Sequence, residues 1–341
     1  MTRVDPTARV QLGRTDLRAT RLGVGTVPIA GLYAPVSEEQ AQATLRRAYE
    51  LGVRYFDTAP LYGYGLAEER LGRFVAGVPR QEVLVATKVG RLLQNARPGD
   101  EPSHRGPLRD RQFKSGSELE PVFDFSYDGA LRSLEASLAR LGLDHVDVLL
   151  IHDPDDHYAD ALNGAYRALE KLRGEGVVRA IGAGMNQPEM LARFARETDM
   201  NCFLLAGRYT LLDQSALAEL LPLCEAKSIR VIIGGVFNSG ILANPSEHAT
   251  YNYQPAERSI VDRALRIEAI CQRHGVPLAA AAVQFPLAHP AVATVLTGVR
   301  SPAEIEVNAH LFQHPIPEAL WDELKAEGFL LAAAPTPAAA T

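Results

Sequence analysis

Four polar side chains stand at or just beyond the ends of apolar segments, and together they are able to move a proton. Asp57 lies in FDTA, Lys88 ends VATK, His152 ends VLLIH, and Tyr62 follows Asp57 by five residues in PLYGYG. A carboxylate and an ammonium are each costly to desolvate alone, so Asp57 and Lys88 are expected to pair. Each residue by itself is equally consistent with a structural ion pair or an ordinary rim side chain. All four together, at the ends of successive apolar runs, favour a reactive site.

The chemistry of this set is acid–base catalysis by a tyrosine. An unperturbed tyrosine has a pKa of about 10, too high for efficient proton transfer near neutral pH. A nearby ammonium stabilises phenolate, so Lys88 is expected to lower the pKa of Tyr62, while Asp57 keeps Lys88 charged and oriented. His152 is placed to hydrogen-bond a substrate oxygen. The set suits proton transfer to or from an alcohol or carbonyl oxygen, with a second partner moving a hydride.

Bringing these side chains together requires parallel strands whose ends meet at one edge. Short apolar runs alternate with longer amphipathic stretches, and the runs lack in/out alternation, as strands buried on both faces do. The predicted strands are Leu22–Thr26, Tyr55–Ala59, Val83–Val89, Val146–His152, Ala180–Met185, Cys202–Arg208, Arg230–Val236 and Thr294–Val299.

Stretches with helical spacing follow these strands. The first begins at Ser37, a predicted N-cap with Gln40 three residues later, which is the spacing of a capping box. The predicted helices are Ser37–Leu51, Leu131–Leu141, Tyr166–Leu172, Glu189–Arg196, Ala216–Ala226, Val261–His274 and Ala303–Leu311.

Eight strand–helix units predict a single α/β domain over residues 1–330, a (β/α)8 TIM barrel with reactive groups at the carboxyl ends of its strands. An open doubly wound sheet is less consistent, because no glycine-rich phosphate turn leads from the first strand into a helix. Residues 9–21 are expected to form a hairpin that caps the barrel bottom, and residues 331–341 a flexible tail. Residues 91–126 form a long connection, expected to be a functional lid or mobile loop.

Composition narrows the class of protein. The 341 residues are 47% hydrophobic and 22% charged, with a net charge of −6, which is typical of a globular protein and excludes a disordered chain. The absence of a basic run argues against nucleic-acid or membrane-surface partners. The N-terminus lacks the apolar core of a signal peptide, and no apolar run reaches the roughly 18 residues of a membrane span. We therefore expect a cytoplasmic monomer or small homo-oligomer.

The three cysteines do not suggest a disulfide or a zinc site. Cys202, Cys224 and Cys271 are far apart and form no CxxC pair, so buried reduced thiols are expected. The acidic cluster of Asp153, Asp155 and Asp156 is better explained by the start of a helix than by a metal, and no metal is predicted.

Five segments, in this order, resemble the aldo-keto reductase family: FDTAPLYGYGLAEERLG, VATKVG, LLIHDPD, AIGAGMNQ and LTGVRSPAEIEVN. The similarity extends from about Val10 to about Phe329. It implies a (β/α)8 barrel, a nicotinamide cofactor bound without a Rossmann fold, and a catalytic tetrad. By motif, that tetrad maps onto the residues chosen above for their chemistry: Asp57, Tyr62, Lys88 and His152.

Within the family, the segments are most similar to the bacterial branch that oxidises D-threo-aldoses such as L-fucose. This implies oxidation of an L-fucose, D-arabinose or L-galactose type sugar at C1 to its aldonolactone, with Tyr62 as general acid/base. The alternatives are a pyridoxal 4-dehydrogenase and an NAD(P)H-dependent aldehyde reductase. A more remote alternative is a cofactor-sensing regulatory module.

The resemblance also implies a cofactor site. Gly298–Ser301, with Glu304 and Asn308, matches the segment that holds the adenosine end. Glu304 would repel a 2′-phosphate, which favours NAD, whereas Arg300 is able to pair with that phosphate and favours NADP; Glu304 is equally consistent with a solvated surface charge. The expected cofactor residues are Gly25, Thr26, Asp57, Asn186, Arg208, Gly234, Gly298, Arg300, Ser301, Glu304 and Asn308.

The substrate pocket is expected to combine aromatic faces with scattered polar groups. That lining suits a sugar and equally suits pyridoxal, and each of its residues is also consistent with rim packing. The expected substrate residues are Tyr33, Tyr62, His152, His157 and Phe237.

Overall fold

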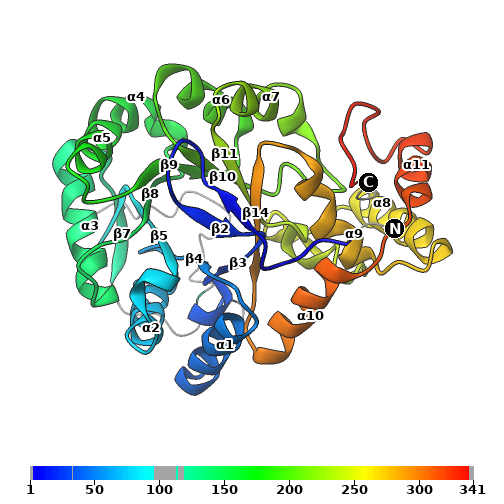
Figure 1. Ribbon diagram of the computed structural model, residues 1–341, viewed down its shortest axis with the longest axis horizontal. Helices are drawn as coiled ribbons and strands as arrows, with labels where there is room; N and C mark the ends of the chain where they lie inside the picture. Colours follow the sequence, from blue (N-terminus) through cyan, green and yellow to red (C-terminus); the bar gives the residue numbers. More distant parts are fainter. Residues whose placement is uncertain (1–2, 33, 96–112, 114–118, 338–341) are drawn as a thin grey trace.

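The predicted strands close into a parallel eight-stranded barrel (Figure 1). The computed structural model describes residues 3–32, 34–95, 113 and 119–337. The strands lie in sequence order around the barrel until β14 pairs with β3, which confirms the (β/α)8 prediction. They are β3 (Leu22–Gly25), β4 (Tyr55–Asp57), β5 (Leu84–Val89), β8 (Val148–His152), β9 (Ala180–Met185), β10 (Cys202–Ala206), β11 (Arg230–Gly234) and β14 (Val292–Gly298).

Helices surround the barrel and cover the outer face of its strands (Figure 1). Ser37 caps α1 as predicted, because its hydroxyl accepts a hydrogen bond from the Gln40 amide at 3.1 Å. The Gln40 side chain instead donates to the carbonyl of Arg300 at 2.9 Å. The helices are α1 (Glu38–Glu50), α2 (Leu66–Val75), α3 (Tyr127–Leu141), α4 (Tyr158–Asp160), α5 (Tyr166–Gly174), α6 (Pro188–Glu197), α7 (Leu220–Ala226), α8 (Arg258–Arg273), α9 (Leu278–Gln284), α10 (Pro302–Gln313) and α11 (Glu318–Ala326).

Burial on both faces explains why the strands are continuously apolar. Every residue of β8 is buried. Leu149 and Ile151 contribute to the large cluster that includes helix residues, while Val148 and Leu150 belong to a second cluster with Tyr55. The barrel interior is therefore packed with side chains, and a ligand has room only at an end.

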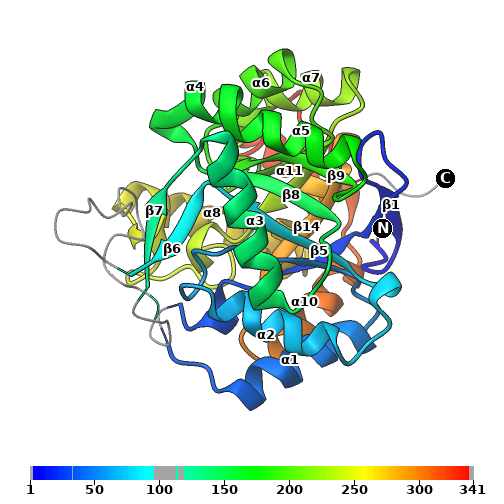
Figure 2. The ribbon, with the colours of Figure 1, turned by 90° about the vertical axis from the view of Figure 1, so that its left-hand side faces the viewer.

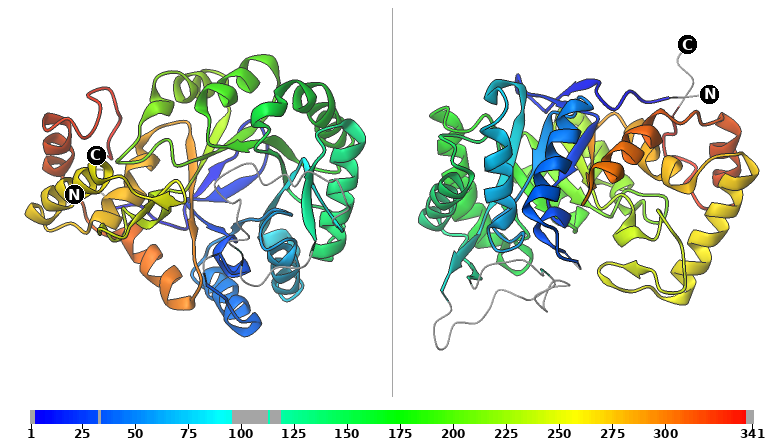
Figure 3. Two further views of the ribbon diagram at one scale, coloured as in Figure 1. Left: turned by 180° about the vertical axis from the view of Figure 1, so that it is seen from behind. Right: turned by 90° about the horizontal axis from the view of Figure 1, so that it is seen from below.

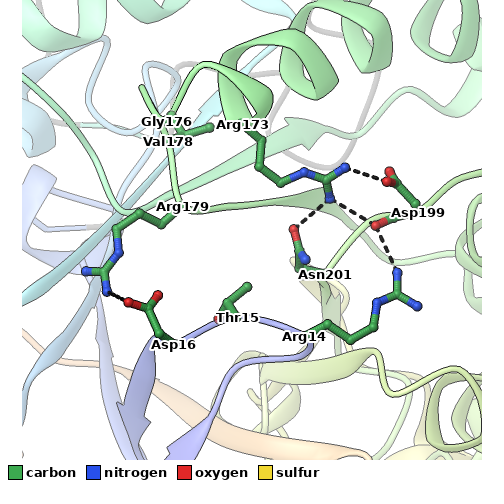
Figure 4. A pocket seen from close by; sticks show the side chains of 9 residues that line it. All are labelled: Arg14, Thr15, Asp16, Arg173, Gly176, Val178, Arg179, Asp199 and Asn201. Carbon is green, nitrogen blue, oxygen red and sulfur yellow. Dashed lines mark hydrogen bonds and ion pairs between the residues drawn. The ribbon is translucent and has the colours of Figure 1, made fainter.

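A two-stranded hairpin closes one end of the barrel, as predicted. It consists of β1 (Arg9–Gln11) and β2 (Arg18–Thr20), and its Leu12 and Leu17 are buried in the interior cluster. A hollow of about 530 Å³ lies beside its turn. Figure 4 shows the side chains that line it. Asp16 pairs there with Arg179 at 2.7 Å, and Arg14 donates to the carbonyls of Asp199 and Lys227. These contacts fasten the hairpin to the barrel.

The opposite end carries two further hairpins (Figures 2 and 3). The long connection that was expected to be a loop begins and ends as an antiparallel pair, β6 (Arg91–Gln94) and β7 (Glu120–Phe123). Residues 96–112 and 114–118 of that connection lie outside the described residues. Its Phe113 forms a β-bridge with Leu32. The second hairpin is β12 (Thr250–Tyr251) with β13 (Gln254–Pro255).

Three smaller expectations concern the cysteines, the C-terminal segment and the possibility of a membrane span. The three cysteines are buried and free, as predicted. In the segment after α11, the Leu331 amide donates to Gln214 at 3.2 Å and Ala334 is buried, whereas residues 338–341 lie outside the described part. Within the described residues, no helix is both long and apolar enough to cross a membrane.

Candidate active site

The ion pair expected between Asp57 and Lys88 lies at the carboxyl ends of adjacent strands. Asp57 is the last residue of β4 and Lys88 is the next-to-last residue of β5. Lys88 Nζ lies 2.6 Å from Asp57 Oδ1 and also donates to the carbonyl of Thr58 at 2.9 Å. Both side chains are almost fully buried. Burial lowers the pKa of the Lys88 ammonium, but the charges and hydrogen bonds of Asp57 and Tyr62 together outweigh that effect, so the pKa is raised and Lys88 stays charged.

Tyr62 and His152 complete the group. Tyr62 lies in the tight turn after β4, where its amide donates to the carbonyl of Ala59 at 3.1 Å. Lys88 Nζ lies 4.8 Å from the centre of the Tyr62 ring. The rings of Tyr62 and His152 meet edge to face, with centres 5.8 Å apart. The structure therefore brings together all four side chains that the sequence singles out.

The expected effect on the tyrosine needs one correction. Burial raises the pKa of Tyr62, and the charge of Lys88 acts in the predicted direction but only opposes part of that rise. Tyr62 is consequently a phenol near neutral pH, able to donate a proton to a carbonyl oxygen. It becomes a phenolate base only under alkaline conditions.

His152 is neutral in this setting. Burial lowers its pKa well below the ordinary value, and the charges of Arg91 and Lys88 add to the effect. Its Nε2 lies 3.5 Å from Asp153 Oδ2. Its Nδ1 is buried without a hydrogen-bond partner among the described residues. A neutral imidazole is suited to hydrogen-bond a substrate oxygen without placing a second cation beside Lys88.

A cleft of about 380 Å³ begins at Asp57 and Tyr62 and extends to Arg300 and Glu304. That volume is in the ordinary range for a small-molecule site. Of the expected residues, the lining includes Gly25, Asp57, Tyr62, Asn186, Gly234, Phe237, Gly298, Arg300 and Glu304.

One wall of the cleft is an open backbone surface. Gly298, Gly25 and Asp57 lie in register across β14, β3 and β4. A Cβ added to Gly25 would have no atom closer than 4.0 Å, so its absence leaves space for a ligand to approach the backbone. Asp57 Oδ2 is buried without a partner in the described part of the chain, whereas His152 is outside the cleft lining. Because such atoms ordinarily find partners, this lining fits a flat polar ring such as a nicotinamide.

The adenosine end expected from the motif is built around the start of α10. Ser301 caps this helix, and its hydroxyl accepts from the Glu304 amide at 3.3 Å. Glu304 Oε2 accepts from the Arg300 amide at 2.7 Å, and Oε1 lies 3.4 Å from the Arg300 guanidinium. Glu304 therefore compensates the charge of Arg300, and both side chains line the cleft.

Four expected cofactor residues lie outside the cleft lining: Thr26, Arg208, Ser301 and Asn308. Ser301 is the cap of α10 described above. The Thr26 hydroxyl donates to the carbonyl of Asp57 at 3.0 Å, so it joins two strands. The Arg208 guanidinium donates to Asn252 at 3.1 Å and lies 3.7 Å from Asp213. Asn308 is buried within α10.

The substrate end also differs in part from the expectation. Phe237 lines the cleft, but the ring centre of His157 lies 5.0 Å from Phe123 and 5.4 Å from Phe125, and His157 is outside the lining. Tyr33 lies outside the described residues. Among the described residues, no group of three or more His, Cys, Asp or Glu side chains is arranged to hold a metal ion.

The cleft also contains residues that were not anticipated from the sequence, among them two in a hairpin turn. Asn252 and Tyr253 line the cleft from the turn between β12 and β13, and both have positive φ angles, 50° and 63°. The Tyr253 amide donates to the Ser239 hydroxyl at 3.1 Å, which holds the turn over the cleft. Asn at a two-residue hairpin turn is the one signal that favoured this element.

The comparisons with known proteins agree with the fold. The chain belongs to the aldo/keto reductase family, whose model matches residues 21–327. It is therefore an oxidoreductase that acts on CH–OH groups and uses a nicotinamide cofactor.

Particular relatives are similar over most of their length. A pyridoxal 4-dehydrogenase from Microbacterium luteolum is 44% identical over 333 residues, which covers 94% of this chain and 97% of the relative. A D-threo-aldose 1-dehydrogenase from Pseudomonas sp. is 44% identical over 319 residues, with coverages of 93% and 95%. The holo form of an aldo-keto reductase from Bacillus halodurans has the same fold, with a TM-score of 0.72 at 24% identity over 96% of this chain and 98% of that one.

Proposed function

We propose that the protein oxidises an aldose of the L-fucose, D-arabinose or L-galactose type at C1 to the aldonolactone. The observation that carries this proposal is the placement of the Tyr62, Lys88 and Asp57 group at the base of a cleft lined by asparagine side chains and aromatic rings. The similarity to a D-threo-aldose 1-dehydrogenase supports the choice of substrate.

In this proposal each residue of the tetrad has a distinct role. Tyr62 accepts the proton of the C1 hydroxyl, Lys88 stabilises the resulting phenolate, and Asp57 holds Lys88 in place. His152 orients the substrate oxygen through a hydrogen bond. When bound, the nicotinamide ring supplies the hydride acceptor, and the open wall beside Gly25 is where the chain leaves room for it.

The lining of the cleft favours a polyhydroxylated ring. Asn186, Asn238 and Asn252 contribute amide groups, which both donate and accept hydrogen bonds, as hydroxyl groups do. The buried Oδ1 of Asn238 has no partner among the described residues and is available to accept from a ligand. Phe237 and Tyr253 add ring faces against which the apolar side of a sugar is able to pack.

A second candidate is oxidation of pyridoxal, because a relative with that activity matches this chain at the same 44% identity. Reduction of an aldehyde is a further possibility consistent with the raised pKa of Tyr62, which keeps the proton donor in its acid form near neutral pH.

Steady-state assays test these candidates. The substrates are L-fucose, D-arabinose, L-galactose, pyridoxal and methylglyoxal. Each is assayed with both cofactors, in the oxidised form for oxidation and in the reduced form for reduction. The proposal requires the highest kcat/KM for one of the sugars. The highest value for pyridoxal or methylglyoxal would assign the alternative activity. Tight NAD(P)H binding without turnover of any of them would support the regulatory module.

The rate of oxidation is expected to rise with pH, by up to about tenfold per unit, between about pH 7 and 10. The active form for oxidation is the phenolate of Tyr62, and burial raises the pKa of that group, so its fraction grows across the whole interval. Reduction uses the phenol and is expected to be flat near neutral pH. Single-turnover rates measure this dependence, and a flat oxidative profile would contradict the role of Tyr62.

We also propose a preference for NAD over NADP. The Glu304 carboxylate lines the cleft. It accepts a hydrogen bond from the Arg300 amide and forms an ion pair with the Arg300 guanidinium. A 2′-phosphate in this region would meet that negative charge and would have to displace it from Arg300.

Replacing Glu304 with glutamine is expected to raise the NADP/NAD ratio of kcat/KM about five- to tenfold, which corresponds to removing a repulsion of about 1 kcal/mol near the surface. Glu306→Gln is the matched control, since Glu306 lies on the same helix but pairs with Arg47. An unchanged ratio in Glu304→Gln, measured with both cofactors, would contradict the assigned role.

A further inference from the structure

A second ion pair, between the buried Arg91 and the half-buried Asp153, lies against His152. Arg91 is the first residue of β6, and Asp153 follows β8. The Arg91 guanidinium donates to Asp153 Oδ2 at 3.0 Å, and the same oxygen lies 3.5 Å from His152 Nε2. Asp153 has a φ of 43°, a left-handed conformation that is unfavourable for a residue other than glycine. Strain of this kind persists where surrounding contacts maintain it.

Arg91 is held from its other side by aromatic rings. Its guanidinium lies 4.9 Å from the ring centre of Phe123, the residue with which it pairs in β7. Phe123 in turn stacks on Phe125, with ring centres 5.6 Å apart. The Arg91 side chain is 10% exposed. The base of the β6–β7 hairpin therefore fixes the cation that faces Asp153.

We infer that Arg91 and Asp153 are a positioning pair for His152. The Asp153 carboxylate orients the imidazole ring, and Arg91 compensates the carboxylate so that the ring remains neutral. This inference rests on the proposed function, because it gives His152 the task of hydrogen-bonding the reacting oxygen.

The charges around His152 show how Arg91 adds to the effect of burial in keeping the ring neutral. Lys88 is compensated by Asp57, so that pair contributes little net charge. Without Arg91, Asp153 would be left as an uncompensated carboxylate beside the ring, which favours the imidazolium. An imidazolium has no lone pair with which to accept from a substrate hydroxyl. The titratable or charged groups that face or influence this ring are Asp57, Tyr62, Lys88, Arg91, Asp153 and Asp155.

The test is the titration of His152 in the cofactor-free protein, followed by NMR of histidine-labelled samples. His152→Gln identifies the resonance by its loss. In Arg91→Gln the midpoint of the His152 titration is expected to move upward by about one pH unit or more. In Arg91→Gln/Asp153→Asn it is expected to return to the range of the parent protein, and Arg91→Lys is expected to leave it low.

Activity supplies the second readout. In Arg91→Gln, kcat is expected to fall about tenfold at pH 6 and less at pH 9, because the imidazolium loses its proton as pH rises. Arg80→Gln is the matched control, since it disrupts an Arg–Asp pair with Asp147 where β5 begins, away from the site. This control is expected to lower stability without altering the His152 titration or the shape of the pH profile.

The outcomes separate this inference from the proposed function. An unchanged His152 titration in a folded Arg91→Gln variant overturns the positioning role, as does a uniform loss of activity at every pH. If Arg91→Gln does not fold, the comparison of Arg91→Lys with the double variant decides, because equal activity losses in both overturn the role. Failure of the parent protein to oxidise any sugar overturns the proposed function, and the cofactor-free titration still tests the pair.

Discussion

Replacing Tyr62 with phenylalanine is expected to reduce turnover by about 10²- to 10⁴-fold, the usual contribution of a general acid or base. The substitution removes one oxygen and preserves the ring. The edge-to-face contact between this ring and His152 is therefore retained. Lys88 also keeps its 2.6 Å contact with Asp57, so the rest of the group stays in place.

The informative measurement compares kcat with cofactor affinity in the same variant. Cofactor affinity, measured by quenching of protein fluorescence, is expected to change little, since the loss concerns proton transfer. Tyr49→Phe is a suitable control because Tyr49 lies on α1, hydrogen-bonds Glu82 and is outside the cleft lining. Retention of most of the parent kcat by Tyr62→Phe would refute the proton-transfer role.

The architecture was predictable because burial on both faces leaves a clear signal in the strands. All eight predicted strands exist, although β4 ends at Asp57 rather than Ala59. The prediction of the helices was less complete. The segment of α9, LAAAAVQ, is apolar up to Gln284 and is almost entirely buried, so it carries no periodic pattern that would reveal a helix.

The tetrad was predictable because its members occupy strand ends or the adjoining turn, where register alone brings them together. Asn252 and Tyr253 were not, because they reach the cleft from a hairpin that no strand end positions. His157 was misleading for a related reason. Its place after β8 suggested the cleft, but its ring packs against Phe123 of β7 and Phe125 and is outside the cleft lining.

Replacing Lys88 with methionine is expected to lower both stability and activity. The Asp57 carboxylate is 3% exposed and would lose the ammonium that compensates it. Breaking a buried ion pair from one side typically costs about 3–5 kcal/mol of unfolding free energy. Activity is expected to fall about 10²- to 10⁴-fold, since Tyr62 would lose the charge that opposes the rise of its pKa.

A double variant separates these two effects. Asp57→Asn/Lys88→Met removes both charges, so urea unfolding should show a large recovery of stability relative to Lys88→Met alone. Turnover should stay low, because no cation remains to stabilise the phenolate of Tyr62. The alkaline rise of the oxidation rate should also begin at higher pH than in the parent protein. Recovery of activity together with stability would show instead that Lys88 supports the fold of the site and takes no part in the proton transfer.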